Sequence, residues 1–462
     1  VNIKTEGEKC VCVCVSVCLC VCVFVCLCPS MRLSWACWGG HRRPLSSWLL
    51  GGVVGEQVRR VVASSPALAV PYAESLRESL PGEWRQALQV PTAPHTPPPA
   101  PALPHNPVDP YQEAQEELDR MADSIKENLR VDHPVMKLAS RYYFSLQGKR
   151  MRPLMVLLMS KAVNAHVENS ERAGTSTYAT PAQLSLAEIT EMIHVASLTH
   201  DDVIDKADTR RGAASINAKF GNKVSVLAGD FLLGRASTML ARLRNTEVVE
   251  LLSKVIEHLA LGEVMQMSGV LPPEELEDKQ AAAAVAKEDL LSRYINGYMN
   301  KSYFKTASLV ANSCRATVLL GAHISDPLER EELMRVAHSF GRHIGYAYQL
   351  IDDTLDFLGD SSSLGKPAMA DLKAGLVTAP VLLAAQDTPE LLPLIERSFS
   401  RSTDLAQGFS LVKDGFQSGA NKTLQLARWH TQQAGSAVST LRPSSARDAL
   451  ISLAFKLSQR TR

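Results

Sequence analysis

The feature that most constrains the fold is a long series of segments in which apolar residues recur at helical spacing. After about residue 108, alternating β-branched runs are rare and proline is sparse beyond Pro153. The pattern predicts helices at 113–129, 155–163, 184–199, 224–243, 248–267, 290–300, 307–320, 333–357, 378–385, 392–399, 405–414, 420–441 and 446–460. Loops are expected at 166–180 and 271–287. The sequence therefore predicts one large all-α domain, a single helical bundle over residues 111–462.

The residues before this body differ from it in composition. Residues 10–28 alternate cysteine with valine or leucine and are long and apolar enough for a membrane span. Strict alternation is unusual in a membrane helix and typical of a translated dinucleotide repeat. We interpret residues 1–30 as a gene-model artefact or non-native leader, with a membrane anchor or a metal-binding cysteine tract as alternatives. In the body, Cys314 stands alone, which favours a reducing compartment over a disulfide scaffold.

Two further segments separate that leader from the body. Residues 31–65 carry five arginines, no lysine and one acid, a composition typical of a transit peptide, with a disordered basic tail as the alternative. We therefore expect residues 31–88 to be a transit peptide and disordered region, directing the chain to a mitochondrion or a plastid. Residues 89–110 contain nine prolines and predict an extended linker. The net charge of +1 gives no reason to expect a nucleic-acid partner.

Two aspartate clusters of the same spacing each follow an apolar run. The first is Asp201, Asp202 and Asp205, and the second is Asp352, Asp353 and Asp356. On a helix, the first and last acids of each cluster share a face. Gly212 is expected to stop the first helix just beyond its acids. One such cluster alone is equally well explained as a solvated turn. Two in one helical chain could face each other across a bundle and hold Mg²⁺ ions that bind a diphosphate.

Basic residues occur in groups that suit phosphate oxygens. Lys149, Arg150 and Arg152 lie beside Gly148, and Arg210 and Arg211 follow the first acids. Lys305 with Thr306, and Lys366, are further candidates. Each group alone is more often a solvated surface feature. Together with two acid clusters, they indicate two anionic sites, one bound through metal and one held directly by cations.

The body resembles the trans-isoprenyl diphosphate synthases. The matching stretches are 148–153, 191–205, 210–212, 226–233, 262–266, 305–309 and 348–356, in the order found in that family. Residues 364–367, 370–372 and 375–380 are most similar to mitochondrial long-chain synthases that make the ubiquinone tail. The sequence departs from the family at Gln147, where Gly is common, at Leu376, where short-chain relatives often carry Lys, and in the loop at 271–287.

The resemblance implies a bundle of the isoprenoid synthase type with a central apolar cavity and about three Mg²⁺ ions in each active site. Its implied metal ligands are Asp201, Asp205, Asp352 and Asp356, and its catalytic residues are Asp201, Asp202, Asp205, Asp352, Asp353 and Lys305. Lys149, Arg152, His194 and Arg211 would hold isopentenyl diphosphate. The allylic diphosphate would contact Arg210, Lys305, Thr306, Gln349 and Lys366. From the residues alone, His194 is as well explained as a satisfied core histidine.

The implied reaction joins isopentenyl diphosphate head-to-tail to farnesyl or geranylgeranyl diphosphate and yields an all-trans-polyprenyl diphosphate. Alternatives are a medium-chain, geranylgeranyl-type synthase, a class I terpene cyclase, or a non-catalytic partner subunit. The partner reading is disfavoured because all six acids are present. The resemblance also implies a homodimer or a heteromer with a second synthase subunit, in the mitochondrial matrix or in peripheral contact with the inner membrane.

Ala196 and Ser197, one turn before the first acids, are expected to set product length, because short-chain relatives carry a bulky aromatic there. Ala196→Phe should shorten a hexa- to decaprenyl product to farnesyl or geranylgeranyl length, because the ring would close the cavity. Thin-layer chromatography of the labelled products measures this directly. A long product of unchanged length from a folded variant would contradict the assignment.

Overall fold

The structure is a computed structural model. It describes the body at residues 107–146, 148–168, 178–268, 287–321, 323–358, 370–373, 375–401, 403–414 and 416–460. Two compact units are distinguished, residues 1–54 and 55–462. In the first, β1 (Asn2–Thr5) and β2 (Glu8–Val11) form an antiparallel hairpin. The expected transit peptide at 31–88, most of the proline-rich linker and the 271–286 loop lie outside the described residues.

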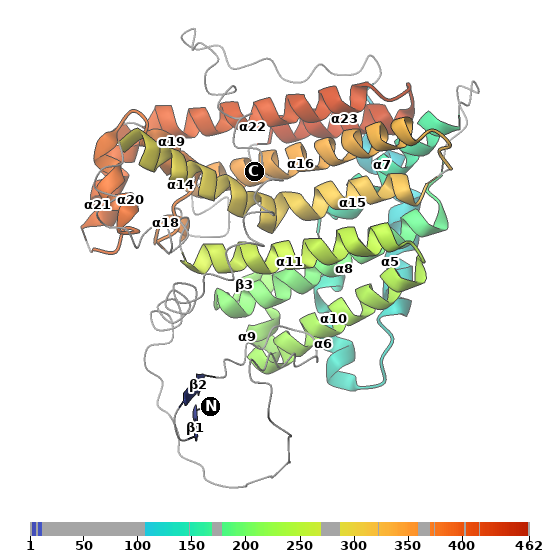
Figure 1. The fold of residues 1–462 in the computed structure, drawn as a ribbon, viewed down its shortest axis with the longest axis horizontal. Coiled ribbons are helices and arrows are strands. Elements are labelled where there is room, and N and C mark those ends of the chain that lie inside the picture. The colour runs from blue at the N-terminus through green and yellow to red at the C-terminus, as the bar shows by residue number, and fades with distance from the viewer. Residues whose placement is uncertain are drawn as a thin grey trace. The chain divides into compact units, whose positions relative to one another are not determined.

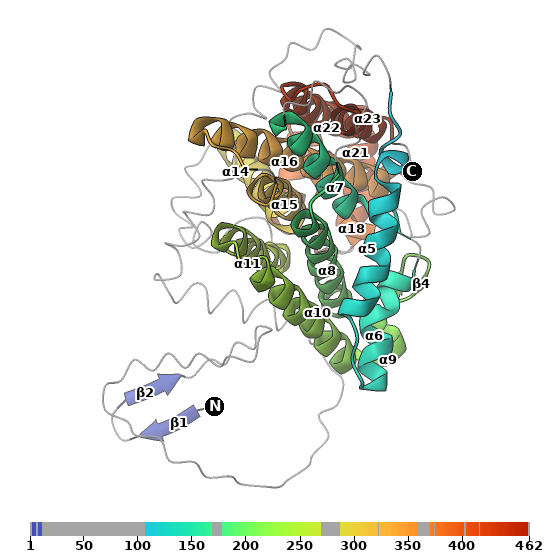
Figure 2. The same ribbon diagram turned by 90° about the vertical axis from the view of Figure 1, so that its right-hand side faces the viewer.

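The second unit is built of helices (Figures 1 and 2). In chain order its described elements are α4 (Pro110–Glu113), α5 (Gln115–Asn128), α6 (Pro134–Ser145), α7 (Met151–Val167), α8 (Pro181–Ile204), β3 (Thr209–Arg210), β4 (Ala213–Ala214), α9 (Ile216–Phe220), α10 (Asn222–Arg242), α11 (Thr246–Ser268), α14 (Lys287–Ser302), the π-helix η3 (Tyr303–Ala307), α15 (Ser308–Leu319), α16 (Pro327–Leu358), α18 (Ala370–Lys373), α19 (Ala379–Ala384), the 3-10 turn η4 (Pro389–Leu391), α20 (Leu392–Glu396), α21 (Asp404–Asp414), α22 (Phe416–Ser439) and α23 (Ser445–Ser458). The all-α prediction is confirmed, and each expected helix has its counterpart.

Helix α6 is one element that the apolar pattern did not reveal. It buries only Ala139, Ser140 and Tyr143, so it has no continuous apolar stripe. Its start is nevertheless encoded, because His133 caps the helix and Pro134 occupies the first turn. The short helix α9 and the β3–β4 hairpin were also not predicted, because each is too short to show a period.

The boundaries of α8 follow from its ends. Thr180 and Gln183 form a reciprocal capping box, and Pro181 fits the first turn. The helix ends at Ile204, with Asp205 as its C-cap and Lys206 in the left-handed conformation at φ 53°. The expectation that Gly212 stops this helix is therefore wrong. Gly212, at φ 76°, instead makes the tight turn of the β3–β4 hairpin, where a side chain would be strained.

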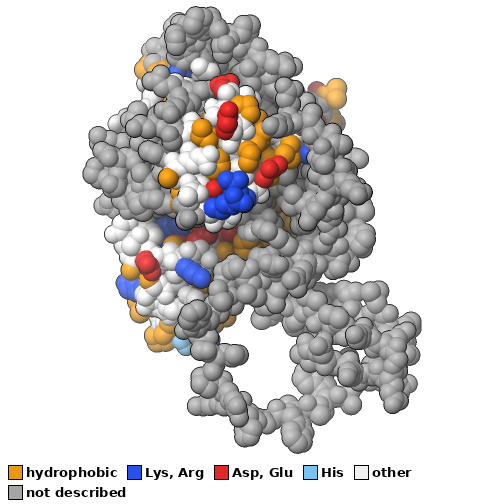
Figure 3. Space-filling model, turned by 90° about the vertical axis from the view of Figure 1, so that its left-hand side faces the viewer, with side chains coloured by type: hydrophobic (Ala, Val, Ile, Leu, Met, Phe, Trp, Pro, Cys, Tyr) orange, Lys and Arg blue, Asp and Glu red, His pale blue; other side chains and the backbone are white. Residues whose placement is uncertain are grey.

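The core is centred on the 32-residue helix α16, which packs along both α15 and α22. Helix α8 packs against α7 on one side and α10 on the other, and α11 lies against α15 (Figure 2). On the face drawn in Figure 3, basic and acidic side chains lie side by side among apolar ones, rather than forming a surface of one sign. This mixture agrees with the net charge of +1.

Close approach of α16 to the η3–α15 segment depends on two glycines. A Cβ at Gly345 would lie 2.4 Å from Cα of Ala307, and one at Gly341 would lie 2.7 Å from Cα of Ala311. Such atoms would overlap with backbone, which cannot move independently of its helix. The two glycines therefore fix the distance between the helices that carry η3 and the second acid cluster.

Gly345→Ala should lower the free energy of unfolding by about 1–3 kcal/mol, because the added methyl forces α16 away from η3. Gly234→Ala is the matched control, since Gly234 lies within α10 with nothing within 4 Å of an added Cβ. The control should be unchanged or about 0.5–1 kcal/mol more stable. Urea denaturation measures both, and equal stability of the two variants would contradict the proposed close contact.

Candidate active site

The first acid cluster lies at the end of α8. Asp201 is in the last turn, and Asp205 follows at the cap, where carboxylates oppose the helix dipole. Burial and the nearby carboxylates of Glu263 and Asp205 together raise the pKa of Asp201 to about 7, against the opposing effect of Lys305. Burial and Glu263 likewise raise the pKa of Asp205. The end of α8 is therefore a place where negative charge is crowded and a cation would be bound.

Asp202 has a different environment from its two neighbours. Its side chain is fully buried and accepts hydrogen bonds from Nε of Arg210 at 2.9 Å and from the hydroxyl of Tyr143. The same hydroxyl accepts a hydrogen bond from the backbone N–H of Ile216 at 3.0 Å. Asp202 thus ties α8 to α6, to the β3–β4 hairpin and to the start of α9. Arg210, expected at the allylic diphosphate, is paired with this carboxylate.

Helix α11 contributes two polar residues to which the sequence analysis assigned no role. Nζ of Lys305 donates to Oε2 of Glu263 at 2.5 Å and to Oε1 of Gln266 at 3.0 Å. The other oxygen of Glu263 is buried, and no hydrogen-bond partner for it occurs in the described part of the chain. Both residues fall in the 262–266 stretch that matched the family pattern, so the signal was present in the sequence. They bring a further carboxylate beside Asp201.

The second acid cluster, near the end of α16, repeats the arrangement of the first. Asp353 is buried and accepts hydrogen bonds from the hydroxyl of Tyr298 at 2.6 Å and from Nε2 of Gln349 at 2.7 Å. In both clusters the middle acid is thus held by a buried tyrosine. The outer acids are less enclosed. Asp352 accepts from Nη1 of Arg460 at 2.7 Å, and Asp356 accepts from the backbone N–H of Asp371 at 3.2 Å.

The π-helix η3 connects the two clusters. Lys305 extends from it toward Glu263 on α11, whereas Oγ1 of Thr306 donates to Oε1 of Gln349 on α16 at 2.8 Å. The wider π-turn presents consecutive residues to different neighbours, and such turns are frequent at functional sites. Gly262 allows α11 to approach, because a Cβ there would lie 2.6 Å from Cγ of Lys305. Lys305, Thr306 and Gln349, all predicted as site residues, are therefore brought together.

A cationic group that includes Arg152 lies close enough to Asp352 to act on its charge. Arg152 lies 3.0 Å from Nε2 of His194, and burial together with Arg152 lowers the pKa of His194 well below its usual value, so the imidazole is neutral. Arg211 packs on Gly148, where an added Cβ would lie 2.9 Å from its Nη1. Burial raises the pKa of Glu191 despite the opposing effects of Arg152 and Arg211. Three of the four residues predicted to hold isopentenyl diphosphate therefore converge.

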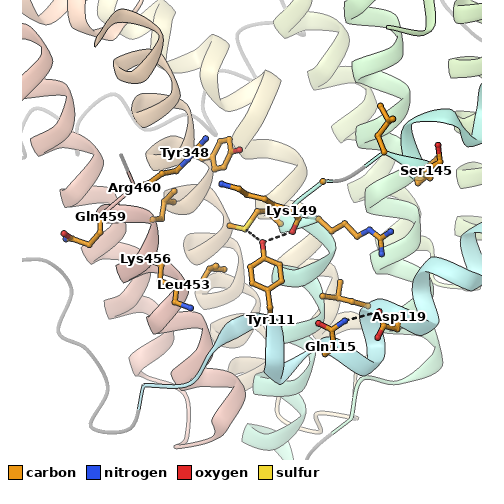
Figure 4. Close-up of a pocket in the computed structure, with 17 residues that line it drawn as sticks. Tyr111, Gln115, Asp119, Ser145, Lys149, Tyr348, Leu453, Lys456, Gln459 and Arg460 are labelled. Carbon is orange, nitrogen blue, oxygen red and sulfur yellow. Dashed lines mark hydrogen bonds between the residues drawn. The ribbon is translucent and has the colours of Figure 1, made fainter. Parts of the chain in front are cut away.

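The fourth, Lys149, lines a neighbouring cavity of about 1090 Å³ (Figure 4). Tyr111, Tyr348, Lys456 and Arg460 line it with Lys149, so helices from both ends of the body form its walls. The hydroxyl of Tyr111 donates to the carbonyl of Lys149 at 2.7 Å. Since Arg460 also contacts Asp352, the cavity adjoins the second acid cluster. Gln147 and Lys366 lie outside the described residues.

The two residues expected to set product length differ in position. Ser197 is half-buried one turn before Asp201, within about 40° of it around the helix, and donates to the carbonyl of His194 at 2.9 Å. Ala196 is fully buried in the apolar core and about 140° from Asp201 around the helix. Of the two, Ser197 shares the helix face of Asp201, whereas Ala196 faces the core.

The donor set fits a hard divalent cation. Its members are carboxylate oxygens, one of which, Oε1 of Glu263, is buried without a hydrogen-bond partner among the described residues. In that same part of the chain, no three His, Cys, Asp or Glu side chains already converge on one metal position. This arrangement suits an ion such as Mg²⁺, which binds through one or two carboxylates and takes its remaining ligands from phosphate and water.

Comparison with known proteins gives concordant results. Residues 133–412 match the family described as polyprenyl synthetase. The chain is 40% identical over 350 residues to the mitochondrial solanesyl-diphosphate synthase 1 of Oryza sativa, covering 74% of this chain and 75% of that protein. It is 41% identical over 354 residues to decaprenyl-diphosphate synthase subunit 1 of Schizosaccharomyces pombe, covering 74% and 88%. The crystal structure of a decaprenyl diphosphate synthase from Rhodobacter capsulatus aligns with a TM-score of 0.61 and 26% identity over 76% of this chain and 98% of that one.

The different environments of Asp201 and Asp202 predict opposite effects on stability. Asp202→Asn should lower the free energy of unfolding by about 3–5 kcal/mol, because it leaves the charge of Arg210 without its buried partner. Asp201→Asn should leave stability unchanged or raise it, because burial and neighbouring carboxylates disfavour the charge.

Chemical denaturation at pH 8 measures both variants. Tyr143→Phe is the intermediate case, with an expected loss of about 1–3 kcal/mol from the unsatisfied Asp202 oxygen and Ile216 N–H. If Asp201→Asn proved as destabilising as Asp202→Asn, the distinction between the two acids would be wrong.

Proposed function

Because the chain belongs to the polyprenyl synthetase family, we propose that it condenses isopentenyl diphosphate head-to-tail onto an allylic diphosphate to give a long-chain all-trans-polyprenyl diphosphate. The chain is an enzyme, a trans-prenyltransferase. One observation carries the proposal: two aspartate clusters, each with its middle acid held by a buried tyrosine, are joined through a lysine and a threonine on one π-turn.

The relatives point to the cellular role. Solanesyl, hexaprenyl and decaprenyl diphosphate synthases of rice, Neurospora crassa and fission yeast are all similar to this chain, and the first two are mitochondrial. The enzyme therefore acts in the mitochondrion, and its product is the precursor of the ubiquinone side chain. Residues 31–88 serve as the transit peptide in this proposal, and residues 111–462 form the catalytic domain.

The acids bind the allylic diphosphate through divalent metal, which belongs to the chemistry of this family. We propose that the metal is Mg²⁺, about three ions in each site, with Asp201, Asp205, Asp352 and Asp356 as ligands. Held by these acids, such ions would supply positive charge that stabilises the leaving diphosphate. Asp202 and Asp353 are held by Tyr143 and Tyr298, and they thereby orient the helix segments that carry the outer acids. Lys305 and Thr306 bind the leaving diphosphate, together with Gln349 and Lys366.

In this proposal, isopentenyl diphosphate binds at the cationic group formed by Arg152 and Arg211 beside His194. Arg152 and Arg211 provide paired donors for its phosphate oxygens, and the neutral His194 donates one further hydrogen bond. Lys149, from the adjoining cavity, adds a fourth donor. The diphosphate is thereby held in place while its double bond is oriented toward the allylic carbon. Departure of the allylic diphosphate leaves a carbocation. The buried apolar side chains around α8 exclude water, which would otherwise trap it.

We propose that the working enzyme is a homodimer or a heteromer with a second synthase subunit. Helix α10 supports assembly, because its outward side leaves Val226 and Leu227 36% and 56% exposed. The name of the Schizosaccharomyces pombe relative calls that protein subunit 1. An assay of the chain on its own separates the two forms of assembly.

Residues 108–462 should incorporate labelled isopentenyl diphosphate into long-chain product when supplied with Mg²⁺ and farnesyl diphosphate. Chelation with EDTA should abolish incorporation, and added Mg²⁺ should restore it. Asp201→Asn should lower turnover by about 100-fold or more while the variant remains folded. Mass spectrometry of the extracted lipid gives the number of isoprene units.

The controls distinguish the alternatives. Activity that appears only after a second synthase subunit is added indicates a heteromer. Cyclised hydrocarbon as the main product would contradict the proposal, as would turnover that persists in EDTA.

A further inference from the structure

Lys301 is a buried cation that the reaction as described above does not use. It lies in the last turn of α14, four residues before Lys305, with 9% of its surface exposed. Its ammonium lies over the ring of Tyr298 at 5.2 Å from the centroid. Among the described residues, no hydrogen bond or ion pair engages this ammonium. A largely enclosed lysine whose ammonium has no hydrogen-bond partner among the described residues is placed to bind an anion.

The charges that act on Lys301 come from several elements, and one of them, Asp353, belongs to the second acid cluster. The carboxylates of Asp353 on α16, Asp371 on α18 and Glu263 on α11 attract its ammonium. Lys305, on the adjoining η3, repels it. None of these carboxylates lies within ion-pair distance of its ammonium. Asp353 is hydrogen-bonded to Tyr298 and Gln349, and Glu263 to Lys305. The lysine is therefore attracted toward the space between the clusters without being neutralised by either.

We propose that Lys301 is a further diphosphate-binding residue, whose ammonium contacts the diphosphate that leaves the allylic substrate. This inference rests on the proposed function and adds a residue to the same site. Lys305 and Lys301 lie one turn apart, so a bridging diphosphate can accept from both. An ammonium is a compact donor that suits a phosphate oxygen, and its contact with Tyr298 holds the stem in place without using its hydrogen atoms.

An alternative role is purely structural, in which the ammonium only balances the charge of Asp353. The two roles predict different behaviour of the free enzyme. A structural counter-ion stabilises the protein without any ligand. A diphosphate-binding residue is a buried unpaired charge in the free protein, so its neutralisation leaves stability unchanged or raises it.

The test uses Lys301→Met, which keeps the length of the side chain and removes the charge. Lys137→Met is the control, since Lys137 is an exposed lysine on α6 to which no role in the site is assigned. Calorimetric titration with inorganic pyrophosphate and Mg²⁺ gives the affinity, and thermal unfolding without ligand gives the stability. Steady-state kinetics separate the KM for farnesyl diphosphate from that for isopentenyl diphosphate.

Lys301→Met should bind pyrophosphate about 10- to 100-fold more weakly, with an unchanged or higher unfolding temperature and an isopentenyl diphosphate KM within about twofold. Lys301→Arg should recover part of the affinity, and Lys137→Met should behave as the parent. Unchanged pyrophosphate affinity would overturn the inference, and so would a fall in unfolding temperature matched by an equal loss for both substrates. Absence of turnover in the parent protein, with and without an added second synthase subunit, would instead contradict the proposed function.

Discussion

The structure depends on the placement of carboxylates where a helix disfavours them. Asp201 and Asp205 at the end of α8, and Asp352 and Asp356 near the end of α16, oppose the dipoles of their helices. The middle acid of each cluster makes this possible, because Tyr143 holds Asp202 and Tyr298 holds Asp353 inside the protein. The outer acids are thereby fixed in position, and Asp352 forms an ion pair with Arg460. Local strain of this kind is expected where a protein must bind something.

The rest of the bundle brings the two clusters together. Gly262 and Gly345 let α11 and α16 approach η3 from opposite sides, so Lys305 and Thr306 reach different helices although they are adjacent in sequence. The cations of α7 and of the β3–β4 hairpin converge beyond Asp352, where Arg152 lies beside His194. In the proposed function, the metal-bound and the directly bound diphosphate thus have separate places in one site.

Much of this arrangement could be predicted from the sequence. The two clusters share one spacing, so their helical placement and their common chemistry follow from the residues alone. The roles within a cluster could not be read in this way, because spacing does not show that Asp202 and Asp353 point into the protein. The end of α8 was misplaced, since Lys206 adopts a left-handed conformation that glycine was expected to provide. Glu263 was missed because its partner Lys305 lies on another element, and Lys301 was missed because its burial follows from the fold and not from its spacing.

The central claim is that the acid clusters bind divalent metal together with a diphosphate, and only weakly without it. Electron paramagnetic resonance of Mn²⁺, titrated into the enzyme with and without an unreactive allylic diphosphate analogue, measures this directly. We predict weak binding of Mn²⁺ alone and tight binding of several ions when the analogue is present, because such ions bind through one or two carboxylates and take further ligands from phosphate oxygens. Equally tight metal binding in the absence of the analogue would contradict this account, as would an analogue that leaves the bound metal unchanged.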